Sequence, residues 1–405
     1  MKGILVVKFG GSCLTDPKNV RLVAEKILAE HRKNKRVVVV VSALTGVTDF
    51  LLKTASEASD GKIGKEEMDE ILSMGERTSQ RIITGVLKAM NAKVVGLDPS
   101  SDLWPIFTDS NHGCAEVDLD KTCKATREKL LPLLEQDYIV VVPGFIGLSP
   151  ENKITTLGRG GSDITAVVLG RCLDAEEVVF VKDVGGVLSA DPKLVSGVAK
   201  VEALDVEEMY SLSSAGAKVL HPKSLKYKTS KMILRVVGMD EPDLSGGTII
   251  KGALGVELNV TLHDKPLAMV SVVGWELSTP ESLTKIFAEA AKSKAKIMGL
   301  TMAPPSLLLY VENPETLIER LNRLIREERV AKAVHKFEPL ALITVSGPGL
   351  EEIPGVVDKI AGPIASRGIN LLGIMTISSS VRVFVAWKDK DEVLNLIRES
   401  LALEA

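Results

Sequence analysis

The residues best suited to chemistry lie near the middle of the chain, where the segment at 158–161 reads Gly-Arg-Gly-Gly. Ser162 and Asp163 follow it, and then the apolar run Ala166–Leu169. Glycine lets a backbone approach a ligand closely, and the order of residues predicts a buried helix that Ser162 or Asp163 caps. Free N–H groups at a helix start attract anions, and Arg159 adds a bidentate partner for a carboxylate. The segment predicts a site for a small acidic substrate; a solvated surface loop is the alternative.

Two other glycine turns follow strands. The strand Ile4–Val7 leads into Lys8, and the valine run Val37–Val41 leads into Ser42. Strand and helix patterns alternate to about residue 237, with further strands predicted at Ala92–Gly96, Tyr138–Val142, Glu177–Val181 and Ile233–Val237. This alternation predicts an α/β three-layer sandwich with a mostly parallel sheet. Because ligands bind beyond the carboxyl ends of parallel strands, we expect Lys8 and Ser42 to line one site, with Gly144 after a third strand.

After Gly255 the pattern changes to two successive β-α-β-β-α runs, the first from Ala268 and the second from Ala341. This indicates an internal duplication and predicts two small ferredoxin-like domains. We expect domains at residues 1–255, 256–337 and 338–405. Two such copies favour edge-to-edge pairing, so the tail is either a dimerisation module or a pair of regulatory domains that bind a small molecule.

Turns at 299–301 and 368–370 are expected at the start of the second strand of each copy. Both turns would place backbone N–H groups near a subunit interface. The candidate effector residues from these segments are Lys296, Met298, Thr301 and Asn370.

The overall composition excludes several classes of partner. The 405 residues carry a net charge of −3, and the absence of a basic stripe argues against nucleic acid. The four cysteines, at 13, 114, 123 and 172, lack metal-ligand spacing, so we expect no metal site and reduced thiols. No apolar run approaches the roughly 18–20 residues that span a membrane, so we expect a cytoplasmic protein.

Six motifs together resemble the aspartate kinases, members of the amino-acid kinase superfamily. In chain order they are Lys8–Ser12, Val40–Asp49, Ser73–Arg77, Gly144–Gly147, Thr155–Ala166 and Gly216–Pro222. The tail resembles the tandem ACT domains of that family, and the resemblance covers essentially the whole chain. It implies an amino-acid kinase catalytic domain followed by two βαββα ACT domains.

The resemblance implies transfer of the γ-phosphoryl group of ATP to the side-chain carboxylate of L-aspartate, which gives 4-phospho-L-aspartate. Such a transfer needs positioning and charge neutralisation more than a protein nucleophile. The catalytic residues it implies are Lys8, Lys218 and Asp163, where Asp163 binds the substrate amino group or orients the lysines. The substrate-binding residues it implies are Thr45, Glu116, Arg159 and Ser162, with Arg159 on the α-carboxylate.

The nucleotide-binding residues implied by the resemblance are Lys8, Gly10, Gly11, Ser12, Ser42, Lys182, Asp183, Gly186, Lys193 and Lys218. Mg²⁺ is expected mainly on phosphate oxygens and water. The segment Lys182–Val187 departs from the usual Thr-Asp-Val-Asp-Gly-Val, so contacts to the base and ribose are expected to differ. Ser378–Val381 departs from a pattern that usually ends in Ser-Glu, so the resemblance leaves open whether lysine, threonine or neither inhibits the enzyme.

Two alternatives to an aspartate kinase stay open. One is a kinase for another acidic amino acid, such as glutamate, acetylglutamate or aminoadipate. The other is a catalytically silent amino-acid sensor, against which the retention of both lysines, Arg159, Asp163 and Glu116 argues. The expected partners are ATP, L-aspartate, a lysine or threonine effector, and further copies of the chain, in a dimer or larger oligomer held by the ACT domains.

Overall fold

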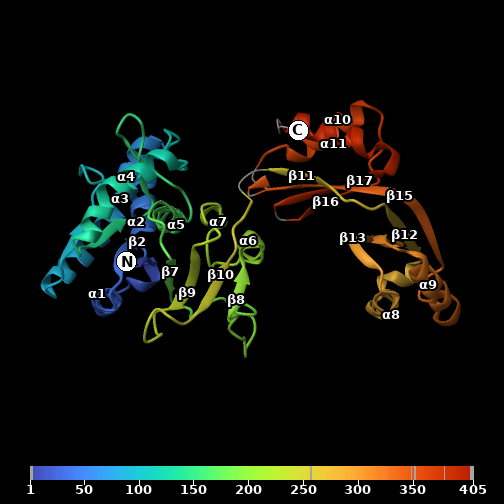
Figure 1. Cartoon of the computed structure of the whole chain (residues 1–405), viewed down its shortest axis with the longest axis horizontal. Helices are drawn as coiled ribbons and strands as arrows, with labels where there is room; N and C mark the ends of the chain where they lie inside the picture. Colours follow the sequence, from blue (N-terminus) through green and yellow to red (C-terminus); the bar gives the residue numbers. More distant parts are fainter. Residues whose placement is uncertain (1–2, 256–257, 348, 351–352, 378, 402–405) are drawn as a thin grey trace. The chain divides into compact units, whose positions relative to one another are not determined.

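The computed structural model describes residues 3–255, 258–347, 349–350, 353–377 and 379–401. The chain divides into an N-terminal unit, Met1–Leu254, and a C-terminal unit, Gly255–Ala405, whose elements are labelled in Figure 1. Ser378, from the segment that departs from the aspartate kinase pattern, lies outside the described residues. No helix in the described ranges is long and apolar enough to cross a membrane.

The N-terminal unit alternates strands and helices. Its helices are α1 (Pro17–Arg32), α2 (Val47–Ala58), α3 (Lys65–Ala89), α4 (Leu119–Glu135), α5 (Gly161–Cys172), α6 (Val206–Ser214) and α7 (Pro222–Leu225), with the 3-10 helix η1 (Gly11–Cys13). Its main strands are β1 (Ile4–Phe9), β2 (Arg36–Val41), β3 (Val94–Gly96), β4 (Ile139–Pro143), β7 (Glu177–Lys182), β8 (Ala203–Asp205), β9 (Ile233–Gly238) and β10 (Thr248–Lys251). A separate hairpin joins β5 (Ile146–Leu148) to β6 (Ile154–Thr156).

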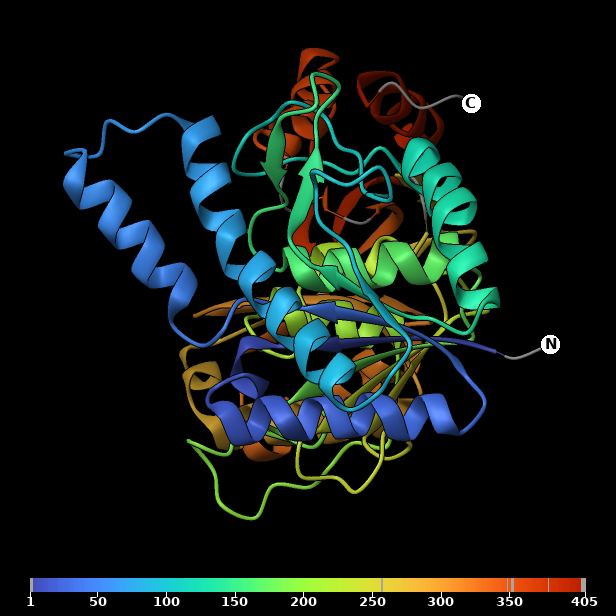
Figure 2. The same ribbon diagram turned by 90° about the vertical axis from the view of Figure 1, so that its left-hand side faces the viewer.

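The main sheet of this unit has the order β3-β4-β2-β1-β7-β9-β10-β8. Every pair from β3 to β9 is parallel, and β10 runs antiparallel to β9. Alternate residues of each valine-rich strand enter different cores: Val6 packs with α4 and α5, whereas Val7 packs with α1 and α3. Figure 2 shows helices on both faces of this sheet. The three-layer α/β sandwich predicted from the alternation is therefore confirmed.

The C-terminal unit is one antiparallel sheet with helices. Its strands are β11 (Asn259–Leu262), β12 (Leu267–Val273), β13 (Lys296–Ala303), β14 (Ser306–Glu312), β15 (Ala333–Ser346), β16 (Gly373–Ile377) and β17 (Ser380–Ala386). Its helices are α8 (Pro280–Ser293), α9 (Glu315–Glu328), α10 (Val356–Ser366) and α11 (Lys390–Ser400), with the 3-10 helices η2 (Trp275–Ser278) and η4 (Trp387–Asp389). The strand order is β13-β14-β12-β15-β17-β16, and β11 also pairs with β15.

The two β-α-β-β-α copies share this sheet through their first strands. β12 of the first copy pairs with β15 of the second, from Leu267 opposite Leu340 to Val273 opposite Ala333. Each copy also has its own core, one beneath α8 and α9 and the other beneath α10 and α11. The edge-to-edge pairing predicted for the copies thus occurs within one chain.

The structure corrects the positions of the two predicted turns. Gly299 lies inside β13, at an irregularity in its pairing with β14, as glycines in strands often do. Gly368, with φ of +70°, follows α10 and serves as its left-handed C-terminal residue. The strand expected from Ile369 therefore begins only at Gly373.

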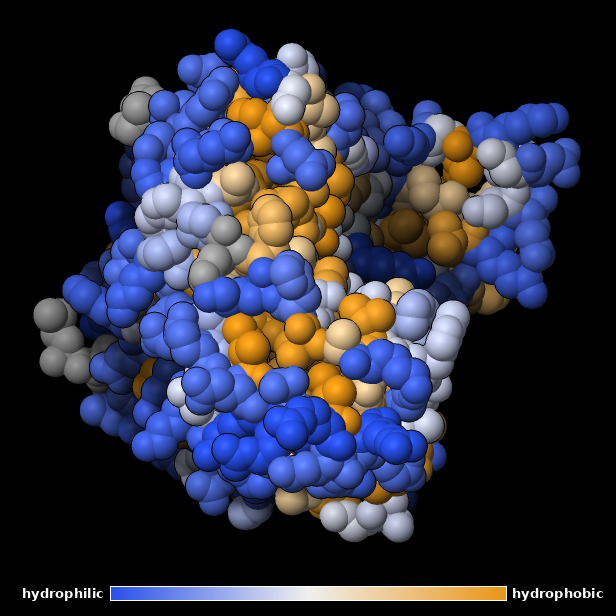
Figure 3. All heavy atoms as spheres, turned by 90° about the vertical axis from the view of Figure 1, so that its right-hand side faces the viewer, coloured by the Kyte–Doolittle hydropathy of each residue, from blue (hydrophilic) through white to orange (hydrophobic). Residues whose placement is uncertain are grey.

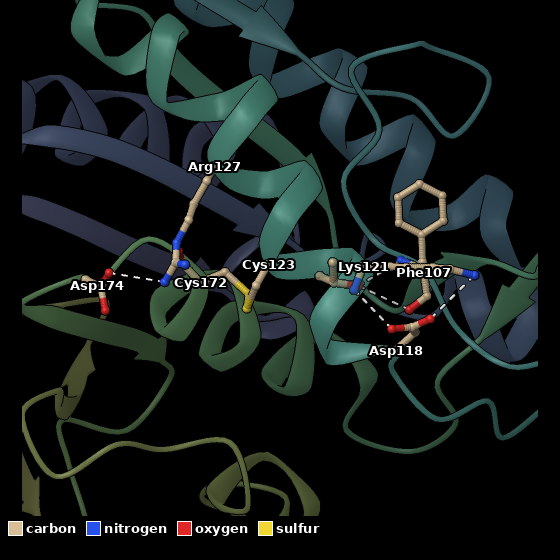
Figure 4. The surroundings of a disulfide bond; sticks show 8 residues. Phe107, Asp118, Lys121, Cys123, Arg127, Cys172 and Asp174 are labelled. Atoms are coloured by element: carbon tan, nitrogen blue, oxygen red, sulfur yellow. Dashed lines mark hydrogen bonds and ion pairs between the residues drawn. A yellow bond between two sulfur atoms is a disulfide. The ribbon is translucent and has the colours of Figure 1, made fainter.

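The expectation of four reduced thiols is wrong for two of them. Cys123 of α4 and Cys172, the last residue of α5, form a disulfide across 49 residues of sequence. Cys13 and Cys114 are free. The scattered spacing of the cysteines did not predict this bond, because α4 and α5 pack side by side although they are far apart in the sequence. Arg127 reinforces the junction, since its Nε donates to the carbonyl of Cys172 at 2.8 Å (Figure 4).

Loss of this disulfide is expected to destabilise the N-terminal unit by about 2–4 kcal/mol, because the bond restricts a long loop of the unfolded chain. Thermal unfolding of Cys123→Ser, with and without reductant, measures the effect. Cys114→Ser is the control, because Cys114 is free and exposed. An unfolding midpoint that reductant leaves unchanged in the parent protein would contradict the prediction.

Candidate active site

Two lysines and an aspartate meet at the carboxyl edge of the parallel sheet. Lys8 lies near the end of β1, and Lys182 is the last residue of β7, the strand beside it. Helix α5 brings Asp163 to this edge, where its Oδ1 lies 2.8 Å from Nζ of Lys8. Lys8 and Asp163 are only 5% and 6% exposed. Lys8 thus lies at the strand ends where the sequence predicted a site, and there it forms a buried ion pair with Asp163 of α5.

The charges of this cluster depend on one another. Burial by itself raises the pKa of the Asp163 carboxyl, but the positive charges of Lys8 and Lys182 outweigh burial and hold that pKa below its usual range. Burial, together with repulsion from Lys8, lowers the pKa of the Lys182 ammonium group, although Asp163 opposes the change. Asp163 thus stays ionised and allows two lysines to share a small volume.

The glycine turn before α5 lies against the late lysine motif. Gly160 is the N-cap of α5, with φ of +74° and no side-chain cap, so the prediction that Ser162 or Asp163 caps the helix is wrong. A Cβ at Gly160 would lie 2.2 Å from Cβ of His221, and this close approach requires glycine. The backbone N–H of His221 donates to Oδ2 of Asp163 at 3.3 Å. Oδ1 of Asp163 therefore forms the ion pair with Lys8, and Oδ2 accepts a hydrogen bond from the backbone.

The predicted substrate-binding residues differ in their surroundings. Arg159 is exposed, and no hydrogen bond or ion pair joins it to any described residue. Ser162 is 8% exposed and packs directly against Gly144, where a Cβ would lie 2.7 Å from that of Ser162. The Thr45 hydroxyl donates to the carbonyl of Gly11 at 2.6 Å and thereby ties two glycine turns together.

Glu116 lies on a loop that is held by a buried carboxylate. Asp69 of α3 is 1% exposed and accepts from the Thr156 hydroxyl at 2.5 Å and from the backbone of Gly113 at 3.1 Å. Nδ1 of His112 also contacts Asp69 at 2.8 Å. The Glu116 side chain is 63% exposed, with Lys223 3.7 Å away. The loop is fixed while the carboxylate of Glu116 faces solvent.

The predicted nucleotide-binding residues differ in their burial and in the contacts that they make. A Cβ at Gly10 would lie 3.5 Å from Nζ of Lys8, and the Ser12 hydroxyl lies 3.5 Å from Asp183. The Ser42 backbone N–H donates to the carbonyl of Phe9. Two lysines differ from Lys8: Lys193 and Lys218 are exposed, and within the described residues the Lys218 side chain makes no hydrogen bond or ion pair. A Cβ at Gly186 would lie 2.7 Å from the Thr248 hydroxyl.

Glu76 is a site residue that sequence reasoning did not assign. It lies on α3 within the Ser73–Arg77 motif and is 5% exposed. Burial raises the pKa of its carboxyl to about 7, although the backbone N–H of Ala43 and the charge of Lys8 favour ionisation. The Ser73–Arg77 motif was the feature of the sequence that could have pointed to Glu76. The sequence could not show that Glu76 is buried next to the turn that contains Ala43.

The raised pKa of Glu76 makes stability depend on pH. The folded state retains a proton that the unfolded state releases above its ordinary value of 4.5, so stability falls as pH rises from about 4.5 to 7. Glu76→Gln is expected to remove this decline and to be about 3 kcal/mol more stable than the parent near pH 8. Urea unfolding of both proteins across this range measures the difference. Parallel pH profiles for the two would refute a titrating Glu76.

Comparisons with known proteins bear on the whole chain. The model of the Amino acid kinase family matches residues 3–238. An aspartokinase of Geobacillus stearothermophilus is 31% identical over 422 residues, covering 100% of both chains. An aspartokinase of Mycolicibacterium smegmatis is 30% identical, covering 99% of this chain and 96% of that protein. The chain belongs to the aspartokinases of the amino acid kinase family.

Solved aspartokinase structures show the same fold. The aspartate kinase of Synechocystis matches with a TM-score of 0.81 at 24% identity, covering 99% of this chain and 70% of that one. Escherichia coli aspartokinase III in complex with aspartate and ADP matches with a TM-score of 0.57 at 24% identity, covering 98% and 100%. The aspartokinase resemblance predicted from six motifs is therefore confirmed.

Proposed function

We propose that this protein is an ATP-dependent aspartate kinase, which transfers the γ-phosphoryl group to the side-chain carboxylate of L-aspartate. The observation that carries the proposal is the buried cluster of Lys8, Asp163 and Lys182, with the exposed Arg159 on the turn that leads into α5, in a chain that aspartokinases match over its full length. The product, 4-phospho-L-aspartate, opens the route to lysine, threonine and methionine in the family.

The cluster suits a reaction in which negative charge has to be balanced. Phosphoryl transfer needs cations aimed at the charge that builds up between donor and acceptor. We assign that role to Lys8, which Asp163 holds at 2.8 Å, and to Lys218, which is exposed and has no described partner to displace. Of the two roles considered for Asp163, these contacts support orientation of a lysine. Lys182, at the end of β7, suits a nucleotide phosphate.

We assign Arg159 to the α-carboxylate of aspartate, because its guanidinium group is exposed and free to form a bidentate pair. Glu116, equally accessible on its fixed loop, suits the substrate ammonium group. Ser162, in the first turn of α5, is assigned as a further hydroxyl donor to the substrate. Thr45 acts through the backbone of Gly11 and positions the turn.

Mg²⁺ is proposed to enter with ATP. The described residues contain no group of three or more histidine, cysteine or acidic side chains placed to hold a metal ion. We therefore propose that phosphate oxygens and water supply most of the ligands of the ion. When bound, the ion neutralises phosphate charge, while Lys8 and Lys218 do so from the protein.

ADP release with ATP, Mg²⁺ and L-aspartate tests the proposal, with hydroxylamine present to trap an acyl phosphate. Glutamate, acetylglutamate and aminoadipate run in parallel. Aspartate-dependent ADP with a trapped hydroxamate is the expected result. Turnover with another acid would reassign the substrate, and ATP binding without turnover on any acid would favour an amino-acid sensor.

We further propose that the C-terminal unit forms the contact between copies in a homo-oligomer and carries control by an amino acid such as lysine or threonine. β13 and β16 are the open edges of its sheet. Both expose apolar side chains: Ile297, Leu300 and Met302 on β13, and Ile374 and Ile377 on β16. Figure 3 shows apolar side chains gathered in patches on the face that it draws. Exposed apolar edges favour pairing with a second chain.

Leu300→Lys is therefore expected to shift the protein from oligomer to monomer, because a lysine on an edge strand opposes pairing. Light scattering after size-exclusion chromatography measures the mass. Leu194→Lys is the matched control, since Leu194 is 82% exposed but lies in the N-terminal unit. A monomeric parent protein, or an unchanged mass for Leu300→Lys, would exclude β13 as the contact.

A further inference from the structure

One buried carboxylate contacts both of the segments that carry charged residues assigned to the substrate. Asp69 lies on α3 and is 1% exposed. Its Oδ1 accepts from the hydroxyl of Thr156, the last residue of β6, at 2.5 Å. Its Oδ2 accepts from the backbone N–H of Gly113 at 3.1 Å and lies 2.8 Å from Nδ1 of His112. Asp69 therefore joins the loop before Glu116 to the strand that leads into the turn of Arg159.

The three contacts of Asp69 form one satisfied network. An ionised aspartate can only accept hydrogen bonds, and each of the three groups around this carboxylate can donate one. Nδ1 of His112 therefore carries the hydrogen of the imidazole ring, because its partner is an acceptor. Hydrogen bonds to a buried charge are stronger than those between neutral groups. Each donor thus ties its own segment of the chain firmly to α3.

The two segments also lie directly against each other. The backbone N–H of Ala115 donates to the carbonyl of Thr156 at 2.9 Å. A Cβ at Gly158, where φ is +71°, would lie 3.3 Å from a carbonyl oxygen of the loop, so glycine permits this close approach. Glu116 comes directly after Ala115 in the sequence, and Arg159 directly after Gly158. The backbone that the Asp69 network fixes is therefore the backbone from which both charged side chains project.

A second neighbour of Glu116 is less suited to hold it. Lys223 lies 3.7 Å from the Glu116 carboxylate, whose side chain is 63% exposed. Exposed ion pairs contribute little, because solvent screens them, whereas the Asp69 network is buried. The network, rather than Lys223, therefore sets the position of Glu116.

We propose that Asp69 is a positioning residue for the amino-acid substrate. Through His112 it fixes the loop that presents Glu116 to the substrate ammonium group. Through Thr156 it fixes the turn that presents Arg159 to the α-carboxylate. The inference rests on the proposed function, which supplies the roles of Glu116 and Arg159. Groups that are fixed before the substrate arrives lower the cost of binding, so the effect falls on aspartate binding more than on the chemical step.

His112→Leu removes one donor of the network at a side chain that is 17% exposed. It is expected to raise the KM for aspartate about tenfold, since a hydrogen bond to a charged group is lost, and to leave kcat and the KM for ATP unchanged. His112→Asn keeps an N–H near the position of Nδ1 and is expected to restore the parent KM. Initial rates across a range of aspartate concentrations, at saturating ATP, measure these constants.

His31→Leu is the matched control for this variant. Nε2 of His31 lies 3.4 Å from Asp137, and the His31 side chain is 20% exposed. The substitution therefore breaks a comparable contact between a histidine and an aspartate within the N-terminal unit. Because α1 carries His31 and neither substrate-binding segment contains it, the KM for aspartate is expected to equal that of the parent protein.

Double variants show whether the network acts through the charged side chains. If His112 acts by placing the Glu116 carboxylate, His112→Leu adds nothing to the KM of Glu116→Gln, because contacts in one chain of cause are not additive. Thr156→Val removes the hydroxyl donor and keeps the backbone carbonyl. It is expected to raise the KM for aspartate and to add nothing in the Arg159→Gln background.

Asp69→Asn is expected to combine the defects of both single variants, and urea unfolding of the same samples measures its stability. If it fails to fold, His112→Leu and Thr156→Val carry the test. An unchanged KM for aspartate in both would overturn the inference. So would an equal rise in the KM for ATP, which indicates a general loss of structure, or fully additive effects in both double variants.

The parent protein separates this inference from the proposed function. No ADP release from the parent with any acid would contradict the proposed function itself. An active parent whose KM for aspartate survives His112→Leu and Thr156→Val would overturn the inference alone.

Discussion

Lys8→Met is expected to lower kcat about 10²–10³-fold, which is the usual effect of removing one group that stabilises transition-state charge. Lys8 is positioned at the end of β1 and held by Asp163 at 2.8 Å, so its charge is fixed before the substrate arrives. Initial rates at saturating ATP and aspartate measure the change. Lys62→Met is the control, because Lys62 is an exposed lysine of the same unit.

The same substitution leaves the Asp163 carboxylate buried without its partner, and such a change costs about 3–5 kcal/mol of stability. A second variant separates this loss of folding from the loss of catalysis. Lys8→Met combined with Asp163→Asn removes both charges of the ion pair but also takes the balancing carboxylate from Lys182, so urea unfolding should show part of the stability restored. Turnover should stay low, because the cation is still absent. If turnover recovers together with stability, Lys8 has a structural role only.

The sheet and the strand-end site were predictable because their causes are local. Five valines in sequence at 37–41 suit only a strand buried on both faces, and parallel strands must end at one edge. Lys8 and Ser42 were placed by that rule alone. Asp163 was predicted as a catalytic residue. Its ion pair with Lys8 depends on how α5 crosses the sheet, and no local sequence pattern determines that crossing.

The failures have a common physical origin in packing between distant segments. The disulfide depends on α4 lying beside α5, although Cys123 and Cys172 are 49 residues apart. Glu76 looks like any helical glutamate until burial raises its pKa to about 7.

Arg159→Gln is expected to lower kcat/KM for aspartate about 10- to 150-fold, mainly through a higher KM, since a bidentate pair with the α-carboxylate contributes about 1.5–3 kcal/mol. Stability is expected to be unchanged, because Arg159 is exposed and bonds to no described residue. Initial rates across a range of aspartate concentrations, at saturating ATP, measure both constants. The KM for ATP should not move, and Arg32→Gln, an exposed arginine on α1, should match the parent protein. A fall in kcat with an unchanged KM for aspartate would instead place Arg159 on the transferring phosphoryl group, since only interactions made in the transition state act in that way.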